Sequence, residues 1–186
     1  MCKFGRSVIS ARCAVGIVLL VAVASLSASA QDKYAVVVGG ETYDTSTFKN
    51  LDYANEDAIE LGKTLKKLGF KTTVMTSESS SSKLRPSTPQ KVADVLKTVA
   101  ASCAAGDTFL VSLSGHGVQF SDEDVLSTGV RETYFCPGDA DLAKKNTLLK
   151  ISSIVQFMVR SAATRKLMLI DSCREEVLST AGQKKS

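Results

Sequence analysis

The sequence predicts an α/β fold: a three-layer α/β/α sandwich in which helices cover both faces of a mostly parallel sheet. Two observations support this prediction. Short runs of β-branched and other apolar residues alternate with longer amphipathic segments, and the order is strand, helix, strand, helix, strand, helix, strand. Such an alternation connects parallel strands by right-handed crossovers. The chain shows no internal repeat that would indicate a solenoid.

Four segments have the length and composition of buried strands. They are residues 34–38, 71–75, 109–113 and 167–170. The first run stops at Gly39-Gly40, as expected where a strand ends in a turn. The sequence therefore predicts a sheet of at least four strands.

Three segments repeat apolar residues at helical spacing. The first covers 54–68 and ends before Gly69, which is typical of a helix C-cap. The second begins at Thr88-Pro89, an N-cap followed by a first helical position, and runs to about Ala105. The third covers 151–158, and the serine-rich stretch 77–87 is predicted to be a solvated loop.

The first thirty residues resemble a secretory leader. Basic residues at 3, 6 and 12 precede an apolar stretch over 14–26, and small residues end the segment at 28–30. The apolar stretch is shorter than the roughly 18 to 20 residues that span a bilayer. We therefore expect residues 1–30 to be a signal peptide cleaved before Gln31, with 31–186 as one exported domain, secreted or periplasmic, without a stable membrane span. The alternative is an uncleaved membrane anchor.

Charge does not indicate a nucleic-acid or anionic-membrane partner. The chain has 23 Lys and Arg against 19 Asp and Glu, and three of the basic residues belong to the predicted leader. The remaining domain is close to neutral, so we expect no nucleic-acid binding.

Three of the five cysteines follow the predicted leader, at positions 103, 136 and 173. An odd number in an exported domain leaves at least one free thiol or an intermolecular bridge, while Cys103 and Cys136 could pair or stay reduced. Their spacing fits no zinc motif, and the chain has a single histidine. We expect no metal site of the Cys/His type.

That histidine, His116, and Cys173 each follow a predicted strand. His116 lies three residues beyond Leu113, and Cys173 lies three residues beyond Ile170. The carboxyl ends of parallel strands meet at one edge of the sheet, so the two side chains can meet if these strands are neighbours. A thiol with a pKa near ~8.5 needs a neighbouring base to be a useful nucleophile. The pair therefore indicates nucleophilic catalysis.

Five segments together resemble the caspase-like cysteine peptidases, and within them the bacterial metacaspase-like branch. They are the strand 34–39, the segment 51–58, Leu68-Gly69-Phe70, Ser114-Gly115-His116-Gly117 and Asp171-Ser172-Cys173-Arg174. The similarity covers nearly all of residues 33 to 175. The spacing of 57 residues between histidine and cysteine is close to the roughly 50 expected of the caspase dyad.

The resemblance implies a cysteine endopeptidase that cleaves protein or peptide substrates after Arg or Lys. Cys173 would attack the scissile carbonyl and His116 would transfer protons, while the backbone amides of Gly117 and Cys173 would hold the oxyanion. Asp57 and Asp171 match acidic residues that line the pocket for the cationic side chain. Simpler interpretations are a solvated Asp57 on the first helix, an Asp171 that only caps a turn, and a Cys173 that is a buried small hydrophobe.

Cofactors are not required by this chemistry, and we expect none. The cluster Asp122, Glu123 and Asp124 resembles the calcium sites of some metacaspases, yet such clusters are more often solvated loops. Calcium is therefore left open as a low-ranked alternative.

Two features depart from the family pattern. The family's small subunit follows the catalytic cysteine, whereas 13 mostly polar residues follow Cys173, so residues 31–186 read as the large-subunit portion without the small-subunit strands. Tyr53 stands where the family often has glycine. The alternative function is therefore a non-catalytic or regulatory module that binds peptides or pairs with a separate small subunit, or forms a homodimer, through an exposed sheet edge. A nucleotide-binding domain is disfavoured because Gly39-Gly40-Glu41 lacks the G-x-G-x-x-G pattern.

Overall fold

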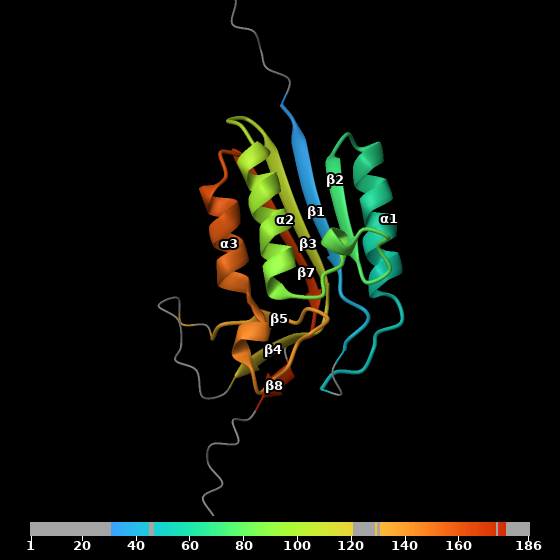
Figure 1. Ribbon diagram of the computed structural model, residues 1–186. Helices are drawn as coiled ribbons and strands as arrows, with labels where there is room; N and C mark the ends of the chain where they lie inside the picture. The colour runs from blue at the N-terminus through green and yellow to red at the C-terminus, as the bar shows by residue number, and fades with distance from the viewer. Residues whose placement is uncertain (1–30, 45–46, 121–128, 130, 174, 178–186) are drawn as a thin grey trace, which may run out of the picture.

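A computed structural model describes residues 31–44, 47–120, 129, 131–173 and 175–177. It confirms the predicted three-layer fold (Figure 1). The main sheet has the strand order β2-β1-β3-β7, and all three pairings are parallel. Its strands are β1 (Lys33–Gly39), β2 (Lys71–Thr76), β3 (Thr108–Gly115) and β7 (Arg165–Ser172). The helices are α1 (Ala54–Lys67), α2 (Pro89–Ser102) and α3 (Ile151–Arg160).

Alternate residues of β1 supply the two cores of the sandwich. Val36 and Val38 are buried in a cluster with residues of α2 and α3, while Ala35 and Val37 are buried in a cluster with residues of α1. Side chains point to opposite faces along a strand, so this division places α2 and α3 on one face and α1 on the other. Figure 1 shows the same arrangement.

The predicted boundary of α2 is confirmed at its start. The Thr88 hydroxyl accepts a hydrogen bond from the Lys91 N–H at 3.2 Å, and Pro89 is the first helical residue. The hydroxyl satisfies a backbone donor that has no partner inside the helix. The end was placed too late, because the helix stops at Ser102.

A second small sheet, which the sequence analysis did not predict, lies beyond the carboxyl ends of β3 and β7. Its strand order is β6-β5-β4-β8, with β4 (Gly117–Phe120), β5 (Tyr134–Phe135), β6 (Leu149–Lys150) and β8 (Glu175–Val177). These strands have two to four residues and carry too little periodicity to be recognised. β4 directly follows His116, β8 begins two residues after Cys173, and the two strands pair in parallel. Both candidate catalytic residues therefore lie at the junction of the two sheets.

The remaining segments add short turns. The predicted loop 77–87 contains one 3-10 turn, η1 (Ser82–Leu84), and a second turn, η2 (Lys145–Thr147), precedes β6. Within the described ranges, none of the helices has the length and apolar character needed to cross a membrane. The predicted leader, residues 1–30, lies outside the described residues.

All three described cysteines are free thiols, which answers the question of pairing left open by the sequence. Cys103 and Cys136 are buried and Cys173 is exposed. Burial raises the pKa of the Cys136 thiol to about 12 and also raises that of Cys103. Cys173 is therefore the accessible thiol of the part that the structure describes.

Candidate active site

Strand pairing brings His116 and Cys173 to the same edge of the main sheet. β3 and β7 are neighbours, with Ser114 opposite Asp171 and Gly115 opposite Ser172. His116 directly follows Gly115, and Cys173 directly follows Ser172, so the two residues come next after this pair. The condition set by the sequence analysis, that these strands be adjacent, is met.

One cavity of about 330 Å³ collects the predicted side chains. It is bounded by the start of α1 and by the ends of β3 and β7. The lining residues are Leu51, Asp52, Tyr53, Ala54, Asp57, Ser114, Gly115, His116, Asp171, Ser172 and Cys173. The structure thus brings His116, Cys173, Asp57 and Asp171 together, although their catalytic and binding roles stay predictions.

The imidazole of His116 forms a cluster of three rings with Tyr43 and Phe48, whose own centroids lie 5.6 Å apart. Its centroid lies 5.0 Å from those of Tyr43 and Phe48, and the Phe48 ring is stacked on it with an interplanar angle of 29°. His116 Nε2 lies 2.9 Å from the carbonyl oxygen of Lys49. A carbonyl oxygen only accepts hydrogen bonds, so Nε2 is the donor in this contact and Nδ1 is the ring nitrogen that does not take part in it.

The Tyr43 hydroxyl links the histidine loop to the end of β1. It accepts a hydrogen bond from the His116 backbone N–H at 3.1 Å and donates one to the Gly40 carbonyl at 2.9 Å. Burial raises the pKa of Tyr43 well above its ordinary value, so the phenol stays protonated. The hydroxyl therefore remains able to make both hydrogen bonds.

The glycines on both sides of His116 are required by close packing. Gly115 has a φ of +152°, and a Cβ there would lie 3.0 Å from the Phe135 ring and 3.1 Å from the Gly40 carbonyl. A Cβ on Gly117 would lie 2.5 Å from the Cys173 carbonyl oxygen. A side chain at 117 would push the histidine segment away from the cysteine segment, whereas one at 115 would clash with Phe135 and the end of β1.

The two predicted carboxylates, Asp57 and Asp171, line the same cavity. Asp57 lies in the first turn of α1, and Asp171 lies near the end of β7. Both are exposed, and both also line an adjoining cavity of about 400 Å³ that extends between α1 and strands β3 and β7. In the described part of the chain neither carboxylate forms an ion pair.

Sequence reasoning missed the residues that hold the histidine. Tyr43, Phe48 and Lys49 lie in the connection between β1 and α1, more than sixty residues before His116. The signal available was an aromatic pair in a short segment that was otherwise polar. Nothing local in the sequence connects that pair with His116.

A buried carboxyl lies in the turn at 137–139, away from His116. The Asp139 backbone N–H donates to the Ser87 carbonyl, but its Oδ1 atom is buried and has no hydrogen-bond partner among the described residues. Burial raises the pKa of this carboxyl, and the nearby Asp44 raises it further. The fold therefore disfavours the charged form of this partly buried carboxyl.

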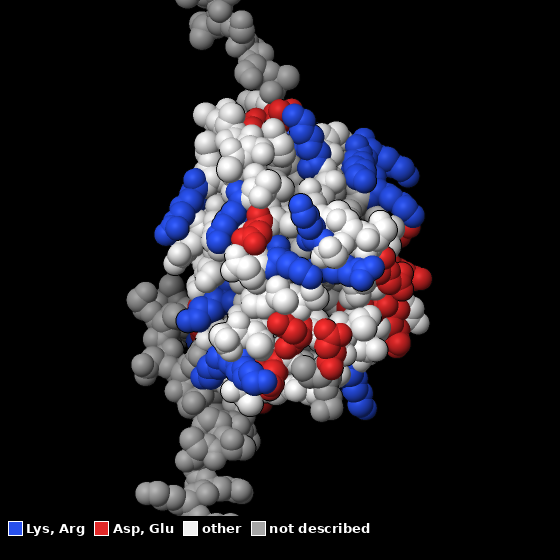
Figure 2. Space-filling model, in the orientation of Figure 1, with Lys and Arg blue, Asp and Glu red and all other residues white. Residues whose placement is uncertain are grey.

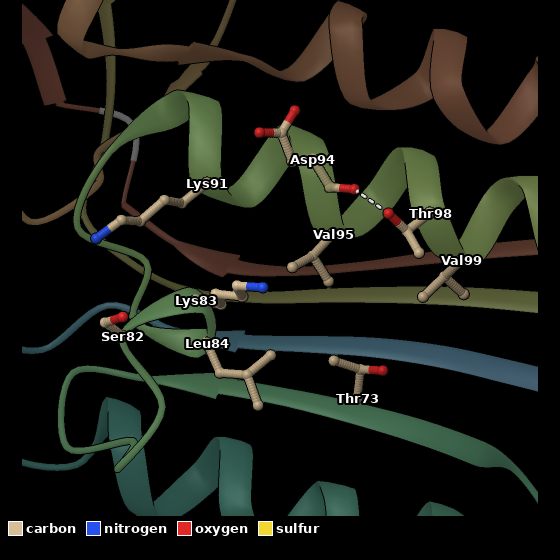
Figure 3. A pocket seen from close by; sticks show the side chains of 9 residues that line it. All are labelled: Thr73, Ser82, Lys83, Leu84, Lys91, Asp94, Val95, Thr98 and Val99. Carbon is tan, nitrogen blue, oxygen red and sulfur yellow. Dashed lines mark hydrogen bonds between the residues drawn. The ribbon is translucent and has the colours of Figure 1, made fainter.

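A larger cavity of about 470 Å³ lies elsewhere, between α2, η1 and β2. Figure 3 shows Val95, Val99 and Leu84 turned toward this space, while the Asp94 carboxylate points away from it. Its lining holds neither a thiol nor an imidazole. This cavity therefore lacks the groups that the predicted chemistry needs.

Neither the visible surface charge nor the described side chains indicate a further ligand site. Figure 2 shows basic and acidic side chains on the same face of the molecule, so that face does not carry a single sign of charge. Over the described ranges, no group of three or more His, Cys, Asp or Glu side chains is arranged to hold a metal ion. The acidic cluster at 122–124, considered for calcium, lies outside the described residues.

A parallel α/β sandwich with a thiol and an imidazole at its carboxyl edge has the architecture of a cysteine peptidase domain. The caspase domain model, Peptidase_C14, matches residues 32–186, and the chain belongs to this family. This confirms the resemblance to the caspase-like cysteine peptidases, while the metacaspase-like branch stays a prediction.

One solved structure with a similar fold is protein GSU0716 from Geobacter sulfurreducens. The sequences are 22% identical, the TM-score is 0.60, and the match covers 78% of this chain and 52% of that one. The chain thus spans about half the length of that structure, and the likeness concerns the fold. No curated protein matches the sequence.

Proposed function

We propose that this protein is a cysteine endopeptidase that uses Cys173 and His116 to cleave peptide bonds after Arg or Lys. The observation that carries the proposal is the single cavity that holds the accessible thiol, the oriented imidazole and two carboxylates. A nucleophile, its base and a charged specificity site within one cavity are the parts that peptide hydrolysis needs.

The first half of the reaction is acylation of Cys173. The thiol proton passes to Nδ1 of His116, and the sulfur attacks the scissile carbonyl carbon, forming a C–S bond. The resulting oxyanion is stabilised by the backbone amides of Gly117 and Cys173. The C–N bond then breaks, and His116 returns its proton to the leaving amine, which leaves a thioester on Cys173.

The second half is hydrolysis of that thioester. His116 takes a proton from a water molecule, and the resulting hydroxide attacks the acyl carbon. The C–S bond breaks, the thiolate recovers a proton from His116, and the new carboxyl terminus is released. The Lys49 carbonyl stabilises the imidazolium formed in each step, since it accepts a hydrogen bond from the Nε2–H over 2.9 Å.

Specificity is proposed to come from Asp57 and Asp171. Two carboxylates that share a cavity, and that form no ion pair with another described residue, favour a cationic side chain in the substrate. Replacing either carboxylate with its amide keeps the size and removes the charge. Asp57→Asn and Asp171→Asn are therefore the sharpest test of this part of the proposal.

The test is an assay of the full chain under reducing conditions on fluorogenic peptides that differ only in a final Arg, Lys or Asp. We expect cleavage after Arg and Lys, none with Cys173→Ala, and at least a tenfold loss of kcat/KM in each amide variant. The absence of all cleavage by a folded protein would reject the peptidase proposal. Cleavage after Asp alone would reject the carboxylate assignment and retain the dyad.

The outer edge of β7 favours a protein partner in addition to the substrate. β7 pairs only with β3 among the described strands, and Leu167, Leu169 and Ile170 on it are each about 45% exposed. An unpaired edge with apolar side chains is a surface for a further strand. We propose that a separate small subunit or a second copy of the chain pairs there and completes the substrate site.

Pairing through β7 is also compatible with the alternative function, a regulatory or peptide-binding module. Analytical ultracentrifugation of the full chain distinguishes a monomer from a homodimer, and Leu169→Lys should abolish a dimer formed through β7. An inactive monomer that still binds substrate peptides would support the module and contradict the peptidase.

Export and calcium remain part of the proposal. We propose that residues 1–30 direct the protein to the periplasm or the outside of the cell, with residues 31–186 as the catalytic portion. N-terminal sequencing of the protein recovered outside the cytoplasm should begin at Gln31. Peptide assays with calcium and with a chelator should give equal rates if no cofactor is needed.

A further inference from the structure

Tyr53 brings an aromatic ring to the cavity that contains the candidate dyad. It lines this cavity together with Asp57, His116, Asp171 and Cys173. The position is the N-cap of α1, directly before the first helical residue. Tyr53 therefore borders the same cavity as the two carboxylates proposed to receive a cationic side chain.

The backbone of the first turn holds Tyr53 and Asp57 in a defined relation. The Tyr53 carbonyl accepts a hydrogen bond from the Asp57 N–H at 2.9 Å. This hydrogen bond fixes the backbone of the N-cap residue against the first turn of α1. Tyr53 and Asp57 both line the same cavity.

The Tyr53 side chain has no structural task that explains its position. It is 68% exposed, the most exposed of the large hydrophobic side chains in the described residues. In the same part of the chain it makes no side-chain hydrogen bond and no ring contact. An aromatic ring in the same cavity as two carboxylates offers a cation both opposite charge and a π face.

We propose that Tyr53 makes the pocket select arginine over lysine. This inference rests on the proposed function, since it assigns a finer specificity to the same carboxylate pocket. A guanidinium is planar and weakly hydrated, so it can stack on the ring while its N–H groups bond to Asp57 and Asp171. An ammonium has no flat face and is strongly hydrated, so it gains less from the ring.

Binding measurements test this inference without requiring turnover. The full chain carrying Cys173→Ala is titrated calorimetrically with acetyl-Ala-Ala-Arg-amide and with acetyl-Ala-Ala-Lys-amide. We expect the arginine peptide to bind roughly fivefold more tightly. Adding Tyr53→Leu, an apolar side chain without a π face, should weaken arginine binding by about the same factor and lysine binding by less than about twofold.

Adding Tyr53→Phe instead should restore the preference, because the ring and not the hydroxyl is the proposed contact. An arginine-to-lysine ratio that Tyr53→Leu leaves unchanged would overturn the inference, as would the failure of both peptides to bind. Circular dichroism confirms that each variant is folded.

Failure of the proposed function has a different signature. If the wild-type chain cleaves neither peptide series while Tyr53 still sets the binding ratio, the peptidase proposal is rejected and the Tyr53 inference stands. If the wild-type chain and Tyr53→Leu cleave after Arg and Lys in the same proportion, the Tyr53 inference is rejected and the peptidase stands.

Discussion

Tyr43→Phe tests how the histidine segment is held, and it needs no substrate. The Tyr43 hydroxyl is buried and makes two hydrogen bonds, to the His116 N–H at 3.1 Å and to the Gly40 carbonyl at 2.9 Å. Removing it leaves a donor and an acceptor without their partner. Each buried unsatisfied group costs about 1 to 3 kcal/mol, and His116 is only half-buried, so we expect a total loss of about 2 kcal/mol.

The matched control is Tyr34→Phe. Its hydroxyl donates to Asp32 over 3.3 Å at a partly exposed position, so the free energy of unfolding should change by less than about 0.5 kcal/mol. Urea denaturation followed by circular dichroism measures both variants. For an m-value of about 2 kcal/mol/M, Tyr43→Phe should lower the midpoint by about 1 M.

A second readout follows from His116 being the only histidine of the chain. Its ring proton resonances are therefore assigned without ambiguity in a proton NMR spectrum. These resonances should shift in Tyr43→Phe. Loss of the hydrogen bond to the His116 N–H should change how the imidazole packs against the two aromatic rings. Equal stability losses in the two tyrosine variants, with unchanged His116 resonances, would refute the role given to this hydroxyl.

Three further predictions concern thiol reactivity, helix capping and pH. Iodoacetamide at pH 8 should label the exposed Cys173 of the folded protein and leave Cys136 unlabelled, as detected by mass spectrometry. A pKa of about 12 leaves only ~10⁻⁴ of the Cys136 thiol ionised at this pH. Equal labelling rates for the two cysteines would contradict the burial of Cys136. Thr88→Ala should cost about 1 kcal/mol through loss of the N-cap, whereas Thr98→Ala on the exposed part of α2 should change stability by less than about 0.5 kcal/mol in urea titrations. The raised pKa of Asp139 means that the folded state favours its protonated form, so this stabilisation is present below the ordinary pKa near 3.8 and is lost as the pH rises through the raised value. The melting temperature of Asp139→Asn relative to the wild type should therefore increase between pH 3.5 and pH 7, and a constant difference would show that Asp139 does not titrate abnormally.

Much of the fold follows from patterns that are local in the sequence. The alternation of β1, α1, β2, α2, β3, α3 and β7 was predictable because each element carries its own periodicity and its own boundary residues, such as Thr88. The second sheet was not, because strands of two to four residues have no usable period and form only by pairing with distant segments.

The same division applies to the candidate site. The sequence by itself determined that His116 and Cys173 each follow a strand and that Asp57 opens a helix, since these are statements about neighbours along the chain. Only the tertiary structure decided that β3 and β7 are adjacent, that one cavity joins these residues, and that Nε2 of His116 contacts the Lys49 carbonyl. These contacts join segments more than fifty residues apart. Their geometry depends on packing between elements, which cannot be predicted from local sequence patterns.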